Sequence, residues 1–319
     1  MAYTQDELRA ELRKLGKRDH EMARLLHPER EPLEHHPNIR IGYFGLADWL
    51  DDQPEPEQRP FRAALAKYVL AQSVYRRRTL AQFKALAGHG VSKAVLAEVD
   101  AARDRKLTVM PYRPKNDNDV NADSEAQRDR PSTWLGFPVR DTDGSVIRGI
   151  GRGTGEGSSV TIDYSPEMWG RDGTAHFSGP ASDADDVLCH ELVHAGRQMN
   201  GKEHSKALNG HYNNEEEFVS ILVTNIYLSE KEQVKLRGSH RSIKTWDGDK
   251  IVARRHDVLL HPERFLQNPQ GLSPPPKELL EKIRNRQPKL WHALVKLRKP
   301  VFNPPRDWEP HRKDGQIDL

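Results

Sequence analysis

The 319-residue sequence has one cysteine, Cys189, and no long apolar run. A single cysteine excludes an intramolecular disulfide, which favours folding in a reducing cytoplasm. No segment approaches the ~20 apolar residues that a membrane-spanning helix needs. Residues 1–20 lack the apolar core and the cleavage site of a secretory signal peptide. We therefore expect a protein that does not enter a membrane and that leaves the cell, if it does, without a cleavable signal.

The chain also has little excess of charge of either sign. The chain has 50 Lys and Arg residues and 47 Asp and Glu residues, so its formal net charge is +3. So small an excess does not point to nucleic acid as a partner. Residues 277–313, however, hold eleven Lys and Arg residues but four Asp and Glu residues. A solvated helical surface is the simplest interpretation of this region, and docking of an acidic partner is the alternative.

The N-terminal region, residues 1–106, is expected to be mainly helical. Thr4 and Glu7 form a capping box for a first helix. A long helix-like run extends from Arg62 to Ala87 and stops at glycines, and Ser92 can begin a further helix. No catalytic grouping stands out here, so targeting, inhibition and delivery of a catalytic part all stay open as roles.

The composition changes after this region. Residues 107–133 are polar and are expected to form a linker between two domains. Residues 134–300 then combine short strand-like segments with helices, which predicts an α+β domain. Residues 301–319 form a basic, proline-containing tail.

The strand-like segments precede the most informative helix. Residues 134–150 predict two strands around the turn Asp143-Gly144, and residues 159–164, SVTIDY, predict a third. Residues 149–157 have glycine at every second position without the spacing of a nucleotide-binding loop, so we interpret them as a mobile loop. We expect the 159–164 strand to be an edge on which an extended substrate pairs.

Residues 186–201, DVLCHELVHAGRQMNG, contain two histidines four positions apart. A capping signal before this stretch and the glycine at its end predict a helix over residues 183–200. His190 and His194 then lie one turn apart on the same face, so both imidazoles can bind one zinc ion. Glu191 lies ~100° around the helix, where it reaches a water on the metal rather than the metal itself.

The alternative interpretation is a buried helix with two hydrogen-bonded histidines. In a chain with 15 histidines, the pattern His-Glu-x-x-His arises by chance with a probability of roughly a few per cent. Cys189 does not pair with His190, because neighbours on a helix point in different directions, and we expect a small buried side chain there. Asp183, Asp185 and Asp186 are expected to stabilise the first helical turn rather than to bind metal.

Zinc needs a third protein ligand. Arg197 and Asn200 occupy the positions at which a metzincin has glycine and histidine, which excludes that arrangement. Residues 212–230, YNNEEEFVSILVTNIYLSE, have the apolar spacing of a second helix. A glutamate on a second helix about twenty residues downstream is the gluzincin arrangement.

Three adjacent glutamates compete for this role. Glu217 borders the apolar stripe of the second helix and is favoured. Glu216 is the next choice, and it lies with Glu215 at the helix start, where carboxylates also stabilise the helix dipole. His204 and His211, in the loop between the two helices, stay open as weaker alternatives.

DVLCHELVHAGRQMNG followed by EEEFVSILVTNIYLSE resembles the bacterial effector zinc metallopeptidases of the NleD-like family, over about residues 158–240. The resemblance implies a zincin-like domain with His190, His194 and Glu217 as zinc ligands and Glu191 as the catalytic glutamate. It also implies an effector or toxin, made in a bacterial cytoplasm and secreted or injected, that cuts a target protein. A secretion apparatus and an immunity protein would be further partners, and the substrate is not implied.

The sequence thus predicts a zinc-dependent endopeptidase in which Glu191 takes a proton from water and passes it to the leaving amine. The competing prediction is a non-enzymatic partner-binding protein with a structural or vestigial zinc site. Because a structural zinc normally has four protein ligands, three good ligands beside an intact Glu191 favour the enzyme. Candidates for stabilising the developing oxyanion are Tyr212, Tyr227, His211, His240 and Arg241.

Overall fold

The structure is a computed structural model. It describes residues 3–28, 30–53, 60–102, 104–113, 125–128, 134–140, 146–170, 173, 180–208, 212, 214–233, 236–237, 265–266 and 273–308. In the strands between residues 125 and 150 it describes the backbone alone. Among these residues, no helix combines the length and the apolar character that crossing a membrane requires.

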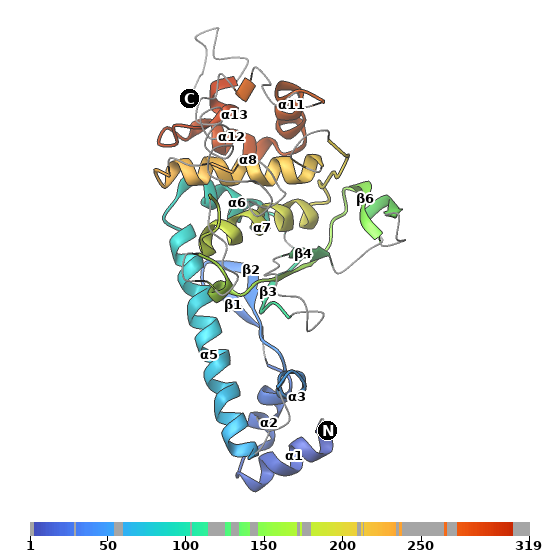
Figure 1. The fold of residues 1–319 in the computed structure, drawn as a ribbon, viewed down its shortest axis with the longest axis vertical. Helices are drawn as coiled ribbons and strands as arrows, with labels where there is room; N and C mark the ends of the chain where they lie inside the picture. The colour runs from blue at the N-terminus through green and yellow to red at the C-terminus, as the bar shows by residue number, and fades with distance from the viewer. Residues whose placement is uncertain are drawn as a thin grey trace, which may run out of the picture.

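A mixed five-stranded sheet lies at the centre of the fold (Figure 1). Its strands, in spatial order, are β1 (Glu31–Leu33), β2 (His36–Ile41), β3 (Leu107–Met110), β7 (Val160–Asp163) and β4 (Glu125–Arg128). The three inner strands are parallel, whereas β1 and β4 run antiparallel to their neighbours at the two edges. Leu107 and Val109 in β3, and Val160 and Ile162 in β7, are buried, as expected for apolar residues that alternate along a strand.

The sheet corrects two expectations about the middle of the chain. Residues 107–133 do not form a linker throughout, because β3 and β4 lie within them and β3 pairs with β2 and β7. β3 has only four residues, of which Leu107, Val109 and Met110 are apolar, and a polar stretch follows them, so composition hides the strand. The strand expected at 159–164 is present as β7, but β4 pairs with it and is the edge strand. Residues 114–124 and 129–133 lie outside the described residues.

Helices cover the sheet in layers (Figure 1). α7 (Ala184–Met199) packs on β4 and β7 and contacts α5 (Phe61–Leu86), α6 (Gly90–Asp100) and the short η2 (Pro166–Met168). α8 (Glu215–Glu230) packs on α7, and beyond it lie α11 (Pro276–Arg286), α12 (Pro288–Lys296) and α13 (Pro304–Trp308). Every residue of α8 is buried, which is the expected position for a helix with apolar residues on all sides. The two helices predicted over residues 183–200 and 212–230 are therefore confirmed as α7 and α8, and both lie inside the fold.

The N-terminal helices form a second, smaller core. α1 (Gln5–Lys14), α2 (Asp19–Leu26) and α3 (Leu46–Asp51) pack on the first half of α5, at the end remote from α7 (Figure 1). The predicted capping box is present, since the Thr4 amide donates to Glu7 Oε2 (2.8 Å) and the Glu7 amide donates to Thr4 Oγ1 (3.3 Å). The expectation of a mainly helical region is incomplete, because β1 and β2 also lie before residue 106 and belong to the sheet.

The N-terminus of α6 is bound by the end of α8. Glu230 accepts hydrogen bonds from the amides of Gly90 (2.8 Å) and Val91 (2.9 Å), so the helix starts two residues before the predicted Ser92. A carboxylate at this position satisfies amides that have no partner within the helix and opposes the helix dipole. α6 and α8, which both contact α7, are thereby fixed to each other.

The predicted hairpin after residue 133 is confirmed as β5 (Trp134–Arg140) and β6 (Val146–Gly153), while its turn at Asp143-Gly144 lies outside the described residues. The glycine-rich stretch that ends β6 packs closely on the end of α7 instead of forming the free loop we expected. Ser158 donates its amide to the Gln198 carbonyl (3.2 Å). Gly157 has φ +72°, and a Cβ on it would lie 2.1 Å from the Met199 carbonyl oxygen.

This contact predicts that Gly157→Ala destabilises the fold strongly. Alanine would add the strain of a positive φ, about 1–2 kcal/mol, to overpacking of about 1–3 kcal/mol against the backbone. Gly155→Ala is the matched control, because Gly155 also has a positive φ, +91°, but has open space around its Cβ position. Urea denaturation should show a clearly larger loss of unfolding free energy for Gly157→Ala. Equal losses would mean that the close contact with α7 contributes nothing.

Candidate metal centre

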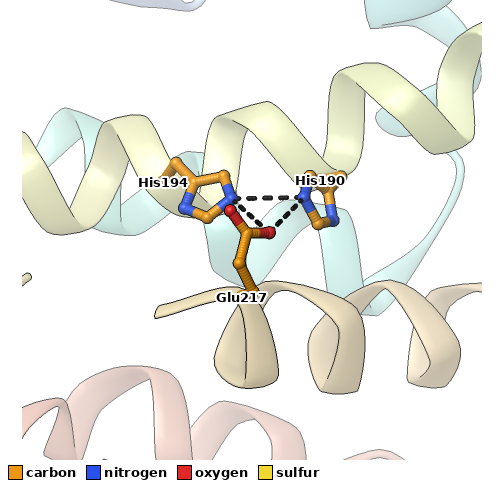
Figure 2. Close-up of side chains that lie close together, drawn as sticks. All are labelled: His190, His194 and Glu217. Atoms are coloured by element: carbon orange, nitrogen blue, oxygen red, sulfur yellow. Dashed lines mark hydrogen bonds and ion pairs between the residues drawn. The ribbon is translucent and has the colours of Figure 1, made fainter. Parts of the chain in front are cut away.

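Three side chains from two helices converge between α7 and α8 (Figure 2). His190 Nε2 and His194 Nε2 are 3.2 Å apart. Glu217 Oε2 lies 3.4 Å from His190 Nε2 and 3.5 Å from His194 Nε2. All three residues are at least nine-tenths buried. The structure therefore brings the three predicted ligands together, as a group that could hold a metal ion.

The start of α8 places Glu217 at this point. Asn214 is the N-cap residue, and its side-chain oxygen accepts a hydrogen bond from the Glu217 amide (2.9 Å). This cap fixes the first turn of α8, and the third residue of that turn faces α7. On α7, the four-residue spacing of the histidines brings both rings to the same side, as a helical period requires.

The two neighbouring glutamates have other partners, so the described cluster contains neither of them. Glu216 accepts two hydrogen bonds from Arg197 Nε, at 2.7 and 2.8 Å, and one from the His204 amide at 3.1 Å. Glu215 pairs with the His204 ring and accepts from Lys282 Nζ (2.9 Å). His204 is therefore bound to these glutamates, and His211, the other weaker alternative, lies outside the described residues.

A layer of hydrogen bonds orients the His194 ring. Its Nδ1 lies 3.1 Å from Ser220 Oγ and 3.4 Å from Glu216 Oε1, which leaves Nε2 to face His190. Such outer contacts fix the tautomer and direction of a metal-binding histidine. Glu216 is held in turn by Arg197, a buried side chain that also bonds Gln287 and the Lys202 carbonyl.

The charges around the cluster favour a cation. Burial lowers the pKa of His190 to about 3, so this ring is neutral and its nitrogen lone pair is available. Burial also disfavours a charged His194, but Glu217, Glu216 and Glu191 outweigh it and raise the pKa of His194 to about 10. Three carboxylates thus act on one buried point. A bound metal ion would supply the positive charge that these carboxylates favour.

Glu191 is buried beside the two histidines on α7. Its negative charge contributes to the raised pKa of His194 and acts on the guanidinium of Arg237. The carboxylate is therefore within electrostatic range of His194 and Arg237, and Glu191 is separate from the three residues that form the cluster. A carboxylate that is near a metal site but is not a ligand can accept a proton there, and this role of Glu191 stays a prediction.

Arg237 is the functional candidate that the sequence did not reveal. Asn225 of α8 holds its backbone: the Arg237 amide donates to Asn225 Oδ1 (2.7 Å), and Asn225 Nδ2 donates to the Arg237 carbonyl (2.8 Å). Burial lowers the pKa of Arg237 while the charges of Glu217 and Glu191 raise it, and its own charge contributes to the low pKa of His190. The guanidinium is thus within electrostatic reach of the cluster. In the sequence, this contact is indicated only by Asn225, a polar residue within the apolar stripe of α8 that needs a hydrogen-bonding partner.

The tyrosines proposed for the oxyanion differ in position. The Tyr227 hydroxyl donates to Asp185 Oδ2 (2.6 Å) in the first turn of α7, outside the cluster, so it has a structural role. Tyr212 is buried against Phe218, with ring centres 5.2 Å apart, and its charge when ionised would act on Arg237. The remaining candidates lie outside the described residues: His211, His240 and Arg241.

The acids at the start of α7 are bound within the protein. Asp183, Asp185 and Asp186 lie close together, and Lys231 donates to Asp185 (2.6 Å) and to Asp186 (2.8 Å). Asp185 and Asp186 therefore share a cationic partner, and the expected stabilisation of the first helical turn by all three acids stays a prediction. Cys189 is a free, fully buried cysteine, and burial raises the pKa of its thiol well above the usual range, as expected for an inert side chain.

The comparison with known families places this site in context. The chain matches the family Peptidase_M91, described as "Effector protein", over residues 68–265. The chain belongs to this family. Membership confirms the expected class, a bacterial effector peptidase, while the closer NleD-like resemblance stays a prediction. The matched region includes α7 and α8 with all three cluster residues, and it begins within α5, after α1–α3. No curated protein and no solved structure matches the chain.

Proposed function

We propose that the protein is a zinc-dependent endopeptidase of the gluzincin arrangement that, as a secreted bacterial effector, hydrolyses a peptide bond in a target protein. The observation that carries this proposal is the convergence of His190, His194 and Glu217. Their donor atoms are separated by 3.2, 3.4 and 3.5 Å. A tetrahedron with zinc–ligand bonds of about 2.0–2.2 Å has edges of about 3.3–3.6 Å, which agrees with these separations.

The donor set supports zinc and an open coordination position. Two imidazoles and one carboxylate form a set that catalytic zinc sites use, whereas structural sites usually have four closed protein ligands. Among the described residues, the cluster contains three ligands. When bound, zinc supplies Lewis acidity that polarises a peptide carbonyl and lowers the pKa of a water molecule to about 7.

The residues of the chain supply the remaining chemistry. Glu191 accepts the proton of the attacking water as the new C–O bond forms. It then returns this proton to the amine nitrogen as the peptide C–N bond breaks. Arg237 presents positive charge to the carbonyl oxygen on which negative charge develops. The edge strand β4 lies against α7 and β7, and its outer backbone groups can pair with an extended substrate chain.

Metal removal tests the proposal directly. We expect zinc-loaded protein to cut some members of a broad mixture of proteins or peptides. Mass spectrometry should then detect new N-termini in this mixture. Chelator treatment should abolish these termini, and stoichiometric zinc should restore them, because the Lewis acid is then replaced. The buried Tyr227→Phe variant is altered in α8, where the Tyr227 hydroxyl bonds Asp185 rather than a residue of the cluster, and it is the control that should cleave normally. Absence of metal-dependent termini over a wide substrate mixture would overturn the proposal.

The role of Arg237 can be separated from metal binding. We expect Arg237→Gln to lower kcat by about 10²–10³-fold, the usual effect of removing one oxyanion-stabilising group, with zinc retained. Arg237→Lys should recover part of the loss, because it restores the charge without the planar fork of the guanidinium. The measurement is kcat and KM for a cleaved peptide. A change in KM alone, or loss of zinc from Arg237→Gln, would contradict this role.

A further inference from the structure

A basic groove lies beside the metal centre. Its volume is about 420 Å³, and it is open to solvent. One wall is the end of β6 and the loop after it, residues 152–155, and a second wall is the loop after α7, residues 201–204. Arg286, at the end of α11, completes the groove. Three cationic side chains line it, Arg152, Lys202 and Arg286, against one carboxylate, Glu203.

These cations are incompletely neutralised. Lys202 Nζ lies 3.5 Å from Glu98, and Arg286 lies 3.8 Å from Glu215, both longer than a strong charge-assisted bond. Within the part of the chain that the structure describes, the Arg152 side chain has no ion pair or hydrogen bond, and it is exposed. The groove therefore presents positive charge that the described residues leave available to a ligand.

Two of the cations, Arg152 and Arg286, line the same groove from different segments. Burial lowers the pKa of Arg286, Glu215 opposes this, and the charge of Arg152 lowers it further. Two guanidinium groups that line one groove are stabilised when a carboxylate lies between them, because each is then attracted to it and these attractions offset their mutual repulsion. This arrangement fits an acidic ligand and disfavours a basic one.

The backbone holds the groove in a fixed shape. The Gly153 amide donates to the Glu203 carbonyl (2.9 Å), and the Gly155 amide donates to the Gly201 carbonyl (3.2 Å), so the two walls are paired like strands. A Cβ on Gly153 would lie 2.4 Å from the Gly201 oxygen. Glycine is therefore required for this close approach, which explains part of the glycine-rich stretch. A site built on paired backbone loses little entropy when a ligand binds.

The groove is connected to the metal cluster through one residue. The His204 amide, in the groove wall, donates to Glu216 Oε2 (3.1 Å), and the other oxygen of that carboxylate lies 3.4 Å from His194 Nδ1. The groove is thus on the His194 side of the site, one side chain removed from the ligands.

We propose that this groove is a subsite for an acidic segment of the target protein, bound by Arg152, Lys202 and Arg286 next to the peptide bond that is cleaved. This inference rests on the proposed peptidase function for its position in the reaction, and on the groove's charge for its ligand. The occupant is a chain of Asp and Glu side chains. The excess of basic residues that the sequence shows at 277–313 includes Arg286, so part of that excess acquires a specific role.

Binding of a labelled glutamate-rich peptide to the full chain, followed by fluorescence anisotropy, tests the groove without requiring hydrolysis. We expect the glutamate peptide to bind more tightly than its glutamine counterpart, and added salt to weaken it. Arg152→Glu should weaken binding by about tenfold or more, because it replaces an attraction with a repulsion. Lys277→Glu is the matched control, since it makes the same charge change at an exposed position of α11 outside the groove. Arg152→Lys should restore most of the affinity.

The outcomes separate this inference from the peptidase proposal. Equal effects of Arg152→Glu and Lys277→Glu, or equal binding of the two peptides, would overturn the subsite even if the protein cleaves peptides. Among cleaved peptides, we expect acidic residues to be enriched on one side of the scissile bond, and Arg152→Glu to remove that enrichment. Cleavage sites without any acidic preference would likewise overturn it. Specific binding without any hydrolysis would overturn the peptidase proposal and leave the acidic ligand of the groove supported.

Discussion

Glu191→Gln should abolish peptide hydrolysis while the protein keeps its zinc. The substitution keeps the size of the buried side chain but removes the carboxylate that we propose accepts the proton. General acid–base catalysis typically contributes about 10²–10⁴-fold to a rate, and a loss of this size is expected in kcat. The measurement compares single-turnover cleavage by wild type and variant at equal zinc content.

Two controls keep this result interpretable. The thermal midpoint of Glu191→Gln should equal that of the wild type, because the amide fits the same space. Its zinc content should also be unchanged, because Glu191 is not one of the three cluster residues. Cleavage at the wild-type rate would remove Glu191 from the mechanism. If a biological effect of the protein persisted in this variant, the non-enzymatic partner-binding alternative would gain support.

Glu217→Ala should have its largest effect on the metal itself. Glu217 lies 3.4 and 3.5 Å from the two histidines and is almost fully buried. Its removal takes away one of the three proposed ligands and a negative charge next to both histidines. Because loss of an outer contact already lowers metal affinity by about 10–100-fold, loss of a ligand should exceed this. Elemental analysis after purification should find about one zinc per wild-type chain and a large deficit in the variant.

Ser220→Ala is the matched control for this experiment. It is on the same helix and also acts on the site, but through the His194 ring rather than through the metal, because Ser220 Oγ lies 3.1 Å from His194 Nδ1. We expect it to weaken zinc binding by no more than about 10–100-fold. If zinc stayed bound in Glu217→Ala, the third ligand would have to be another residue, with Glu216 next in order. If the wild type bound no zinc at all, the metallopeptidase proposal would fail.

The three residues of the cluster could be predicted from the sequence, because the spacing of residues along a helix determines which of them share a face. His190 and His194 must share a face on any helix, and Glu217 borders the apolar stripe of the next helix. The choice among the three adjacent glutamates depended on where α8 begins. The cap by Asn214 and the binding of Glu216 to Arg197 settle which carboxylate faces the histidines, and neither contact can be read from spacing.

The surroundings of the cluster were less accessible, because they come from distant segments. Arg237, whose backbone is held by Asn225, is within electrostatic range of the cluster, and Arg197 bonds Gln287, ninety positions away in the chain. The sheet was misjudged for the same reason. β3 is short, and β4 follows a polar stretch, so their pairing with β7 was not visible in local composition. An edge strand can be assigned only when its neighbours are known.

The complete burial of α8 has a consequence for the order in which this protein can become active. α8 is covered on its outer side by segments that come late in the chain. Phe302 donates its amide to Ser229 Oγ (2.9 Å), and Lys282 binds Glu215. Until those segments have emerged from the ribosome, α8 lacks cover on this outer side, and a helix gains most of its stability from the packing of its apolar surface. A partly synthesised chain would therefore hold α8 less firmly, and the cluster of His190, His194 and Glu217 would become fixed only once the chain through Phe302 has joined the fold.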